Sequence, residues 1–177
     1  MEISLFEPRI PQNTGSIART CAAFDITLNL IEPFGFKLDD KYLKRAGLDY
    51  WHLMKIINYQ NFDVFKKAKK NNRVVSFSKK NGIYLHDFEF QMNDILLFGR
   101  EDNGLPDQII EKSEALVSIY MPNKASELNN NIGVRSLNLS VACGIALYEA
   151  HKQINKISHK WYCWWFILLI CLGSSAG

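Results

Sequence analysis

Polar residues that can orient a ligand gather in three short stretches of this 177-residue chain. The first stretch, residues 11–19, contains an Asn-Thr-Gly run and ends on Arg19. The second, residues 99–106, holds two glycines, and the third, residues 135–140, alternates leucines with Ser and Asn. Amide and hydroxyl side chains donate and accept hydrogen bonds, Gly lets the backbone approach a ligand, and Arg binds anions. Each stretch therefore has the chemistry to bind a polar ligand.

Two familiar types of site do not fit these stretches. In the second stretch, Leu105 and Pro106 stand where a triphosphate-binding loop requires Lys and Ser or Thr, and no dinucleotide-binding GxGxxG is present. The four cysteines form no CxxC pair, so we expect no metal. Taken singly, each stretch also has a purely structural explanation. The first and third can be capped helices, with Ser136 as the natural cap of the last helix, and the second can be a plain connecting loop.

The hydrophobic pattern predicts strands that end next to these stretches. We expect strands at residues 2–7, 27–31, 55–59, 73–77, 94–98 and 116–121. We expect a helix of three turns after the capping residues 13–16, and further helices at residues 39–45, 62–70, 106–112 and 136–154. This alternation predicts an α/β fold, a mainly parallel sheet flanked by helices. Such sheets bind ligands at the carboxyl ends of their strands.

Composition indicates an ordinary globular protein, with 47% hydrophobic residues and a net charge of +3. The basic residues are unevenly placed, and seven of them fall within residues 66–80: Lys66, Lys67, Lys69, Lys70, Arg73, Lys79 and Lys80. This cluster is either a set of phosphate contacts or a solvated surface. Met1 leads straight into a strand pattern rather than a signal peptide, so we expect a cytoplasmic protein.

An apolar tail follows the last expected helix. Residues 161–172 form an uninterrupted apolar run that would extend roughly 18 Å as a helix, short of the ~30 Å hydrocarbon core of a bilayer. We therefore expect no membrane span. The tail is a membrane-surface anchor, a packing segment or an end unrelated to the fold, and the last two are favoured. We place one domain at residues 1–155 and the tail at residues 156–177.

Taken together and in this order, the three stretches resemble the motifs of the SPOUT methyltransferases. The likeness is best to the small, single-domain tRNA wobble-nucleotide 2′-O-methyltransferases and covers about residues 1–155. It is carried by residues 13–19, 97–106 and 135–140, with further signatures at residues 7–8, 31–33, 35–36, 45–50 and 147–150. Residues 123–134 are longer than is common in the family, and the tail has no counterpart there.

The resemblance implies a fold, a reaction and partners. The fold would carry a deep C-terminal trefoil knot, and the protein would be a homodimer with active sites at the subunit interface. It would transfer a methyl group from S-adenosylmethionine, without a metal, to the ribose of nucleotide 34 in tRNA. The substrate would be held by its anticodon arm, so RNA rather than DNA is the expected nucleic acid.

Motif positions also carry roles onto residues of this chain. The catalytic residues implied by the resemblance are Arg19, Asn138 and Ser140. The implied S-adenosylmethionine site consists of Phe77, Gly99, Glu101, Gly104, Met121, Ser136, Leu137 and Asn138. The implied RNA contacts are Arg19, Lys44, Arg45 and Arg135. Arginine is a poor proton acceptor, so for Arg19 we expect an electrostatic role on a phosphate or a developing alkoxide.

Other functions remain open from the sequence. The same fold could serve as a catalytically idle RNA-binding protein, or the enzyme could act at another tRNA or rRNA position. The apolar tail could instead direct a membrane-peripheral role. The motifs specify neither which tRNAs are methylated nor which group removes the hydroxyl proton.

Overall fold

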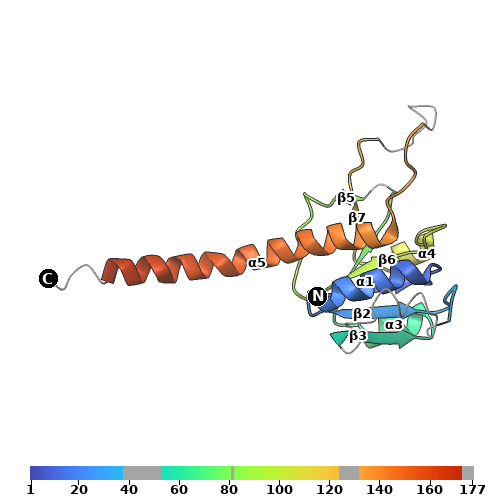
Figure 1. Cartoon of the computed structure of the whole chain (residues 1–177), viewed down its shortest axis with the longest axis horizontal. Coiled ribbons are helices and arrows are strands. Elements are labelled where there is room, and N and C mark those ends of the chain that lie inside the picture. Colours follow the sequence, from blue (N-terminus) through green and yellow to red (C-terminus); the bar gives the residue numbers. More distant parts are fainter. Residues whose placement is uncertain (38–52, 81, 124–131, 173–177) are drawn as a thin grey trace.

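A parallel sheet of seven strands lies at the centre of the computed structural model, which describes residues 1–37, 53–80, 82–123 and 132–172 (Figure 1). Its order is β3-β2-β1-β6-β4-β7-β5. The strands are β1 (Glu2–Phe6), β2 (Thr27–Ile31), β3 (Lys55–Tyr59), β4 (Arg73–Phe77), β5 (Ile83–Tyr84), β6 (Asp94–Phe98) and β7 (Ala115–Ser118). Every pairing is parallel, so the predicted α/β class is confirmed.

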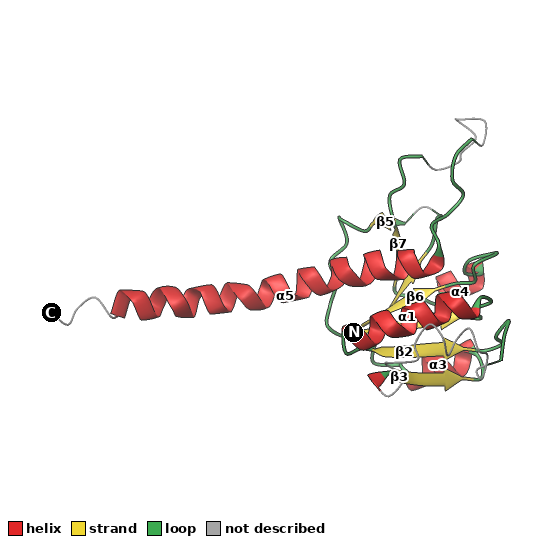
Figure 2. Ribbon diagram, in the orientation of Figure 1, coloured by secondary structure: helices red, strands yellow, loops and turns green. Residues whose placement is uncertain are grey.

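Helices cover both faces of the sheet (Figure 2). On one face, side chains of α1 (Pro11–Ala23) and α5 (Leu139–Leu172) pack in a single core cluster with the strands. On the other face, α3 (Phe62–Ala68) and α4 (Asp107–Glu111) contribute to a second cluster. Strand β6 lies between these layers and is buried at every position, which explains its continuous apolar run.

The first helix begins earlier than the sequence predicts. Residues 13–16 were expected to cap α1, but the helix starts at Pro11, after Ile10 at the N-cap position. Proline suits the first turn because its fixed φ is already helical and its missing N–H needs no partner there. Asn13 and Thr14 are consequently buried within the first turn and do not cap it.

The last helix differs from its prediction at both ends. Helix α5 begins at Leu139 rather than Ser136. Asn138 Oδ1 accepts hydrogen bonds from the backbone N–H of Ser140 at 2.9 Å and of Val141 at 3.4 Å, so Asn138, not Ser136, is the cap. At the other end α5 continues past the predicted end at residue 154 to residue 172 and extends away from the sheet (Figure 1). No Gly or Pro interrupts residues 155–172.

Strand β7 ends at Ser118, three residues before its predicted end. It ends there because neither neighbouring strand extends further: β4 ends opposite Val117, and β5 ends opposite Ser118. The two-residue strand β5 was not predicted from the sequence. The predicted helix at residues 39–45 lies outside the described residues. Within the described part of the chain, no helix has the length and apolarity needed to cross a membrane.

Candidate active site

A cavity of about 400 Å³ lies at the carboxyl ends of β4, β6 and β7, where the fold class predicts a ligand site. Residues of four chain segments line it: 77–80 at the end of β4, 98–105 at the end of β6, Ile119 and Met121 after β7, and 136–139 with Ala142 at the start of α5. Ile10 and Asn13 at the beginning of α1 complete the wall. The three polar stretches of the sequence therefore meet at one place.

The wall formed by residues 99–104 is a tight turn that closes on itself. The backbone N–H of Arg100 donates to Gly104 O at 3.2 Å, and that of Gly104 donates to Arg100 O at 2.9 Å. A Cβ at Gly99 would lie 2.2 Å from the carbonyl carbon of Gly104, and Gly104 itself has a φ of +70°. Both positions therefore require glycine, the first for space and the second for its backbone conformation.

Glu101 joins this turn to the start of α1. Its carboxylate accepts hydrogen bonds from the backbone N–H groups of Arg9 at 2.8 Å and Ile10 at 3.2 Å, and from Asn13 Nδ2 at 3.1 Å. These N–H groups precede or begin the helix, where the helix dipole also favours a negative charge. The structure thus gives Glu101 a positioning role between two walls of the cavity.

Asn13 and Asn138 extend the connection to α5. Asn138 Nδ2 donates to Asn13 Oδ1 at 3.0 Å, while Asn138 Oδ1 accepts from the Ser140 hydroxyl at 2.7 Å and from the Ser140 N–H. Glu101, Asn13 and Asn138 thereby form a continuous chain of hydrogen bonds through all three polar stretches. Moving one wall of the cavity requires breaking bonds to the next.

The floor of the cavity is apolar. The rings of Phe77 and Phe98 stack with centroids 4.6 Å apart and planes inclined by 16°. Leu105, Ile119 and Met121 are further apolar lining residues. A floor of this kind suits a flat heterocyclic ring, while the polar chain above it can bind hydroxyl, amino and carboxylate groups.

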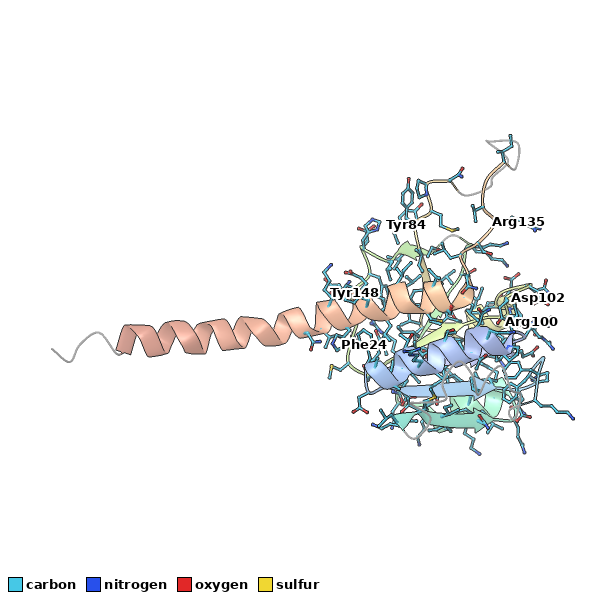
Figure 3. The ribbon with its side chains drawn as sticks, in the orientation of Figure 1. Phe24, Tyr84, Arg100, Asp102, Arg135 and Tyr148 are labelled. Carbon is cyan, nitrogen blue, oxygen red and sulfur yellow. The ribbon has the colours of Figure 1, made fainter. Side chains whose placement is uncertain are left out.

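Opposite charges alternate at the rim, where Arg100 and Asp102 lie together beside the start of α5 (Figure 3). Arg100 Nε and Nη2 donate to the two carboxylate oxygens of Asp102 at 2.9 and 2.6 Å. This hydrogen bonding lowers the pKa of Asp102 to about 2 and raises the pKa of Arg100. Both side chains therefore stay charged at neutral pH.

The predicted cofactor-binding residues are brought together. All eight line the cavity: Phe77, Gly99, Glu101, Gly104, Met121, Ser136, Leu137 and Asn138. Of the predicted catalytic residues, Asn138 lines the cavity and Ser140 contacts Asn138, whereas Arg19 is exposed on α1 and is not a lining residue. Arg135 is likewise exposed and does not line the cavity, and Lys44 and Arg45 lie outside the described residues.

Several lining residues were missed from the sequence. Lys79 and Lys80 line the cavity, although the sequence pattern placed them only in the basic cluster of residues 66–80. Their position directly after β4 was the available signal, because ligand sites form at strand ends. Asn13 and Arg100 were part of the motifs but had no assigned role.

The basic cluster is largely engaged within the protein. Four of its members form ion pairs: Lys66 with Glu114, Lys69 with Glu2, Arg73 with Asp94 and Lys80 with Asp107. The described contacts therefore favour the structural interpretation of the cluster. Among the described residues, no three His, Cys, Asp or Glu side chains are placed to hold a metal ion.

Comparison with known proteins gives consistent matches. The model of the SpoU rRNA Methylase family matches residues 1–148, which contain every residue lining the cavity. The tRNA (cytidine(34)-2′-O)-methyltransferase of Saccharophagus degradans is 41% identical over 161 residues, covering 89% of this chain and 98% of that protein.

Two solved structures are also similar. One, from work described as structural insights into the 2-OH methylation of C/U34 on tRNA, is 40% identical with a TM-score of 0.80, covering 88% of this chain and 96% of the other. AviRb from Streptomyces viridochromogenes, a SpoU methyltransferase in complex with AdoMet, is 24% identical with a TM-score of 0.74, covering 88% of this chain and 61% of AviRb. At that identity AviRb shares the fold.

Proposed function

Because the chain belongs to the SpoU rRNA Methylase family, we propose that it transfers the methyl group of S-adenosylmethionine to the ribose 2′-hydroxyl of nucleotide 34 in tRNA. Family membership confirms the resemblance expected from the three motifs. The observation that carries the proposal is the 41% identity to a tRNA (cytidine(34)-2′-O)-methyltransferase over 89% of this chain. The hydrogen-bonded cavity lies within the family match and supplies the site.

The cavity fits S-adenosylmethionine in size and chemistry. Its volume of about 400 Å³ lies within the usual range of small-molecule sites. The stacked rings of Phe77 and Phe98 suit an adenine, and the carboxylates of Glu101 and Asp102 suit a molecule that carries an ammonium and a sulfonium. Bound there, S-adenosylmethionine supplies an electrophilic methyl group.

The residues of this chain would contribute positioning and electrostatics. Asn138, fixed by Asn13 and by its capping bonds, can orient the ribose hydroxyl or the methyl donor without first reorganising. Ser140 holds the Asn138 side chain in that orientation. Arg19 would hold a phosphate or the developing alkoxide, as expected for an arginine that does not accept protons.

A homodimer would explain why Arg19 lies outside the cavity of its own subunit, because a site at the subunit interface can take residues from both chains. An apolar stripe on α5 supports this arrangement. Val141, Ile145 and Tyr148 lie on one helical face and are 50%, 40% and 63% exposed. Sedimentation of the wild type and of Ile145→Glu tests it, since a charge within a dimer contact favours the monomer.

The packing of α5 supports the trefoil knot. Its residues Cys143 and Leu147 share a core cluster with Ile17 of α1 and with Phe88 and Phe90 of the connection between β5 and β6. Helix α5 therefore shares one core with α1 and with that connection, as the threaded topology would require. A crystal structure traced from residue 77 to residue 150 would test the topology.

Substrate and compartment follow from the same proposal. The exposed Arg135, in the segment leading to α5, would contact the anticodon arm together with Lys44 and Arg45. The buried, free thiols of Cys21 and Cys143 agree with a reducing cytoplasm.

The decisive experiment is methyl transfer from labelled S-adenosylmethionine to unmodified tRNA, followed by mapping of the methylated ribose. We expect one 2′-O-methyl group at position 34. Methylation at another position of tRNA or in rRNA would show that the proposed target is wrong and the proposed reaction is right. If the protein bound RNA but calorimetry detected no binding of S-adenosylmethionine, it would be a catalytically idle RNA-binding protein and not an enzyme. An active Arg19→Ala variant at saturating tRNA would remove the role given to Arg19.

A further inference from the structure

Three exposed aromatic side chains, Tyr84, His86 and Tyr120, contact one another beside the cavity and form what we call the aromatic cluster. The Tyr84 and His86 rings lie nearly parallel, with centroids 5.7 Å apart and planes inclined by 8°. Tyr120 and Tyr84 make a T-shaped contact, with centroids 5.7 Å apart and planes inclined by 87°. Tyr84 is 47% exposed, Tyr120 is 60% exposed and the His86 side chain is 64% exposed. Their mutual contacts fix ring faces that remain open to solvent.

The aromatic cluster lies on the outside of a cavity wall. Ile119 and Met121 line the cavity, whereas Tyr120 between them does not line it and is exposed. Figure 3 shows Tyr84 and Arg135 on the same side of α5. A polynucleotide whose ribose enters the cavity must continue across the rim, because its neighbouring nucleotides are too large to enter with it.

We propose that the aromatic cluster stacks an unpaired base of the RNA substrate next to the methylated nucleotide, with Tyr120 and His86 as the ring platforms. This inference rests on the proposed function. Single-stranded RNA loops are recognised by stacking of their splayed bases on aromatic side chains. Tyr84 supports both platforms, because it stacks on His86 and makes a T-shaped contact with Tyr120.

The polar parts of the aromatic cluster favour RNA over a second protein chain. Two tyrosine hydroxyls belong to it, and His86 Nε2 lies 3.4 Å from the exposed carboxylate of Asp87. A dry protein contact would take these groups out of water at a cost. A stacked base covers a ring face and leaves the hydroxyls and the imidazole edge hydrated. The apolar stripe on α5 has two aliphatic side chains, Val141 and Ile145, and one hydroxyl, that of Tyr148, so it suits a protein contact better.

Steady-state methylation of unmodified tRNA by full-length variants tests the stacking. For Tyr120→Ala we expect KM for tRNA to rise about 10-fold, which corresponds to ~1.4 kcal/mol and falls within the range measured for one stacked base. Tyr120→Phe should stay within about twofold of the wild type, because the ring is kept, and Tyr120→Leu should behave like Tyr120→Ala. Calorimetry should show unchanged affinity for S-adenosylmethionine in all three variants.

A binding measurement separates this inference from the proposed function. An anticodon stem-loop carrying 2-aminopurine beside nucleotide 34 should lose fluorescence on binding the wild type and Tyr120→Phe, but not Tyr120→Ala. This signal does not require methyl transfer, so it can fail or succeed independently of activity. Met92→Ala is the matched control, because Met92 is 69% exposed and lies outside the cavity and the aromatic cluster.

Three results would overturn the proposal. The first is an unchanged KM together with unchanged quenching in Tyr120→Ala. The second is a Tyr120→Leu variant with the KM for tRNA and the quenching of the wild type, because an aliphatic side chain restores hydrophobic contact but not stacking. The third is dissociation of a wild-type dimer by Tyr120→Ala in sedimentation, which would assign the aromatic cluster to a contact between protein chains.

Discussion

Replacing Glu101 with alanine should loosen the cavity and lower the stability of the protein. Three N–H donors lose their acceptor: the backbone groups of Arg9 and Ile10 and the side-chain amide of Asn13. Hydrogen bonds to a charged group contribute about 1.5–3 kcal/mol each, but the site is partly exposed and water can replace some of them. We therefore expect the free energy of unfolding to fall by about 2–4 kcal/mol.

Urea unfolding followed by circular dichroism measures this change as a lower midpoint at an unchanged slope. Calorimetry on the folded variant should also show weaker S-adenosylmethionine binding, because one wall is no longer attached to α1. Glu101→Gln should be milder, since it keeps one acceptor oxygen. Glu111→Ala is the matched control, an exposed acid of α4 for which we expect a change within about 0.5 kcal/mol. If Glu101→Ala were as stable as this control, the role given to the carboxylate would be refuted.

Further outcomes follow from other contacts. Gly99→Ala should fail to bind S-adenosylmethionine in calorimetry and should melt at a lower temperature, because its Cβ would meet backbone at 2.2 Å. Asn138→Ala should lose about 1 kcal/mol of stability in urea through the missing cap, and Asn138→Asp should keep most of it. Asp102 has its pKa lowered to about 2 from 3.8 by hydrogen bonding to its arginine, so the pair stabilises the fold above about pH 4 and loses this effect as pH falls toward 2. The melting-temperature difference between wild type and Asp102→Asn should shrink over that interval. Burial raises the pKa of Cys21 to about 12 and also raises that of Cys143, so mass spectrometry should find both unalkylated by iodoacetamide at pH 8 in the native protein.

Sequence patterns located the site because its residues follow buried strands. The apolar run of β6 and the glycines after it sufficed to place residues 99–104 at a strand end, and motif order supplied the rest. The sequence could not assign Glu101 its partners, however, because Arg9 and Ile10 lie more than ninety residues away in the chain. Contacts at that separation depend on the sheet order, which local patterns do not encode.

The helix starts were harder to predict for a related reason. Asn13 and Ser136 have the right chemistry for capping, but Asn13 bonds to Glu101 and Asn138 instead, and Asn138 takes the cap of α5. Several residues near each helix start could cap it equally well by local sequence, and tertiary hydrogen bonds determine which of them, if any, does. The two-residue strand β5 is too short to leave a pattern and exists only because β7 is there to pair with it.

The hydrogen-bond chain through Glu101, Asn13 and Asn138 also has a consequence for synthesis of the protein. It joins residues from the first tenth of the chain to a residue in the last quarter, separated by 125 positions. During translation the wall at the start of α5 therefore cannot join the other two until Asn138 has left the ribosome. A chain terminated between residues 118 and 138 would carry all seven described strands yet lack the wall that Asn138 joins to Asn13.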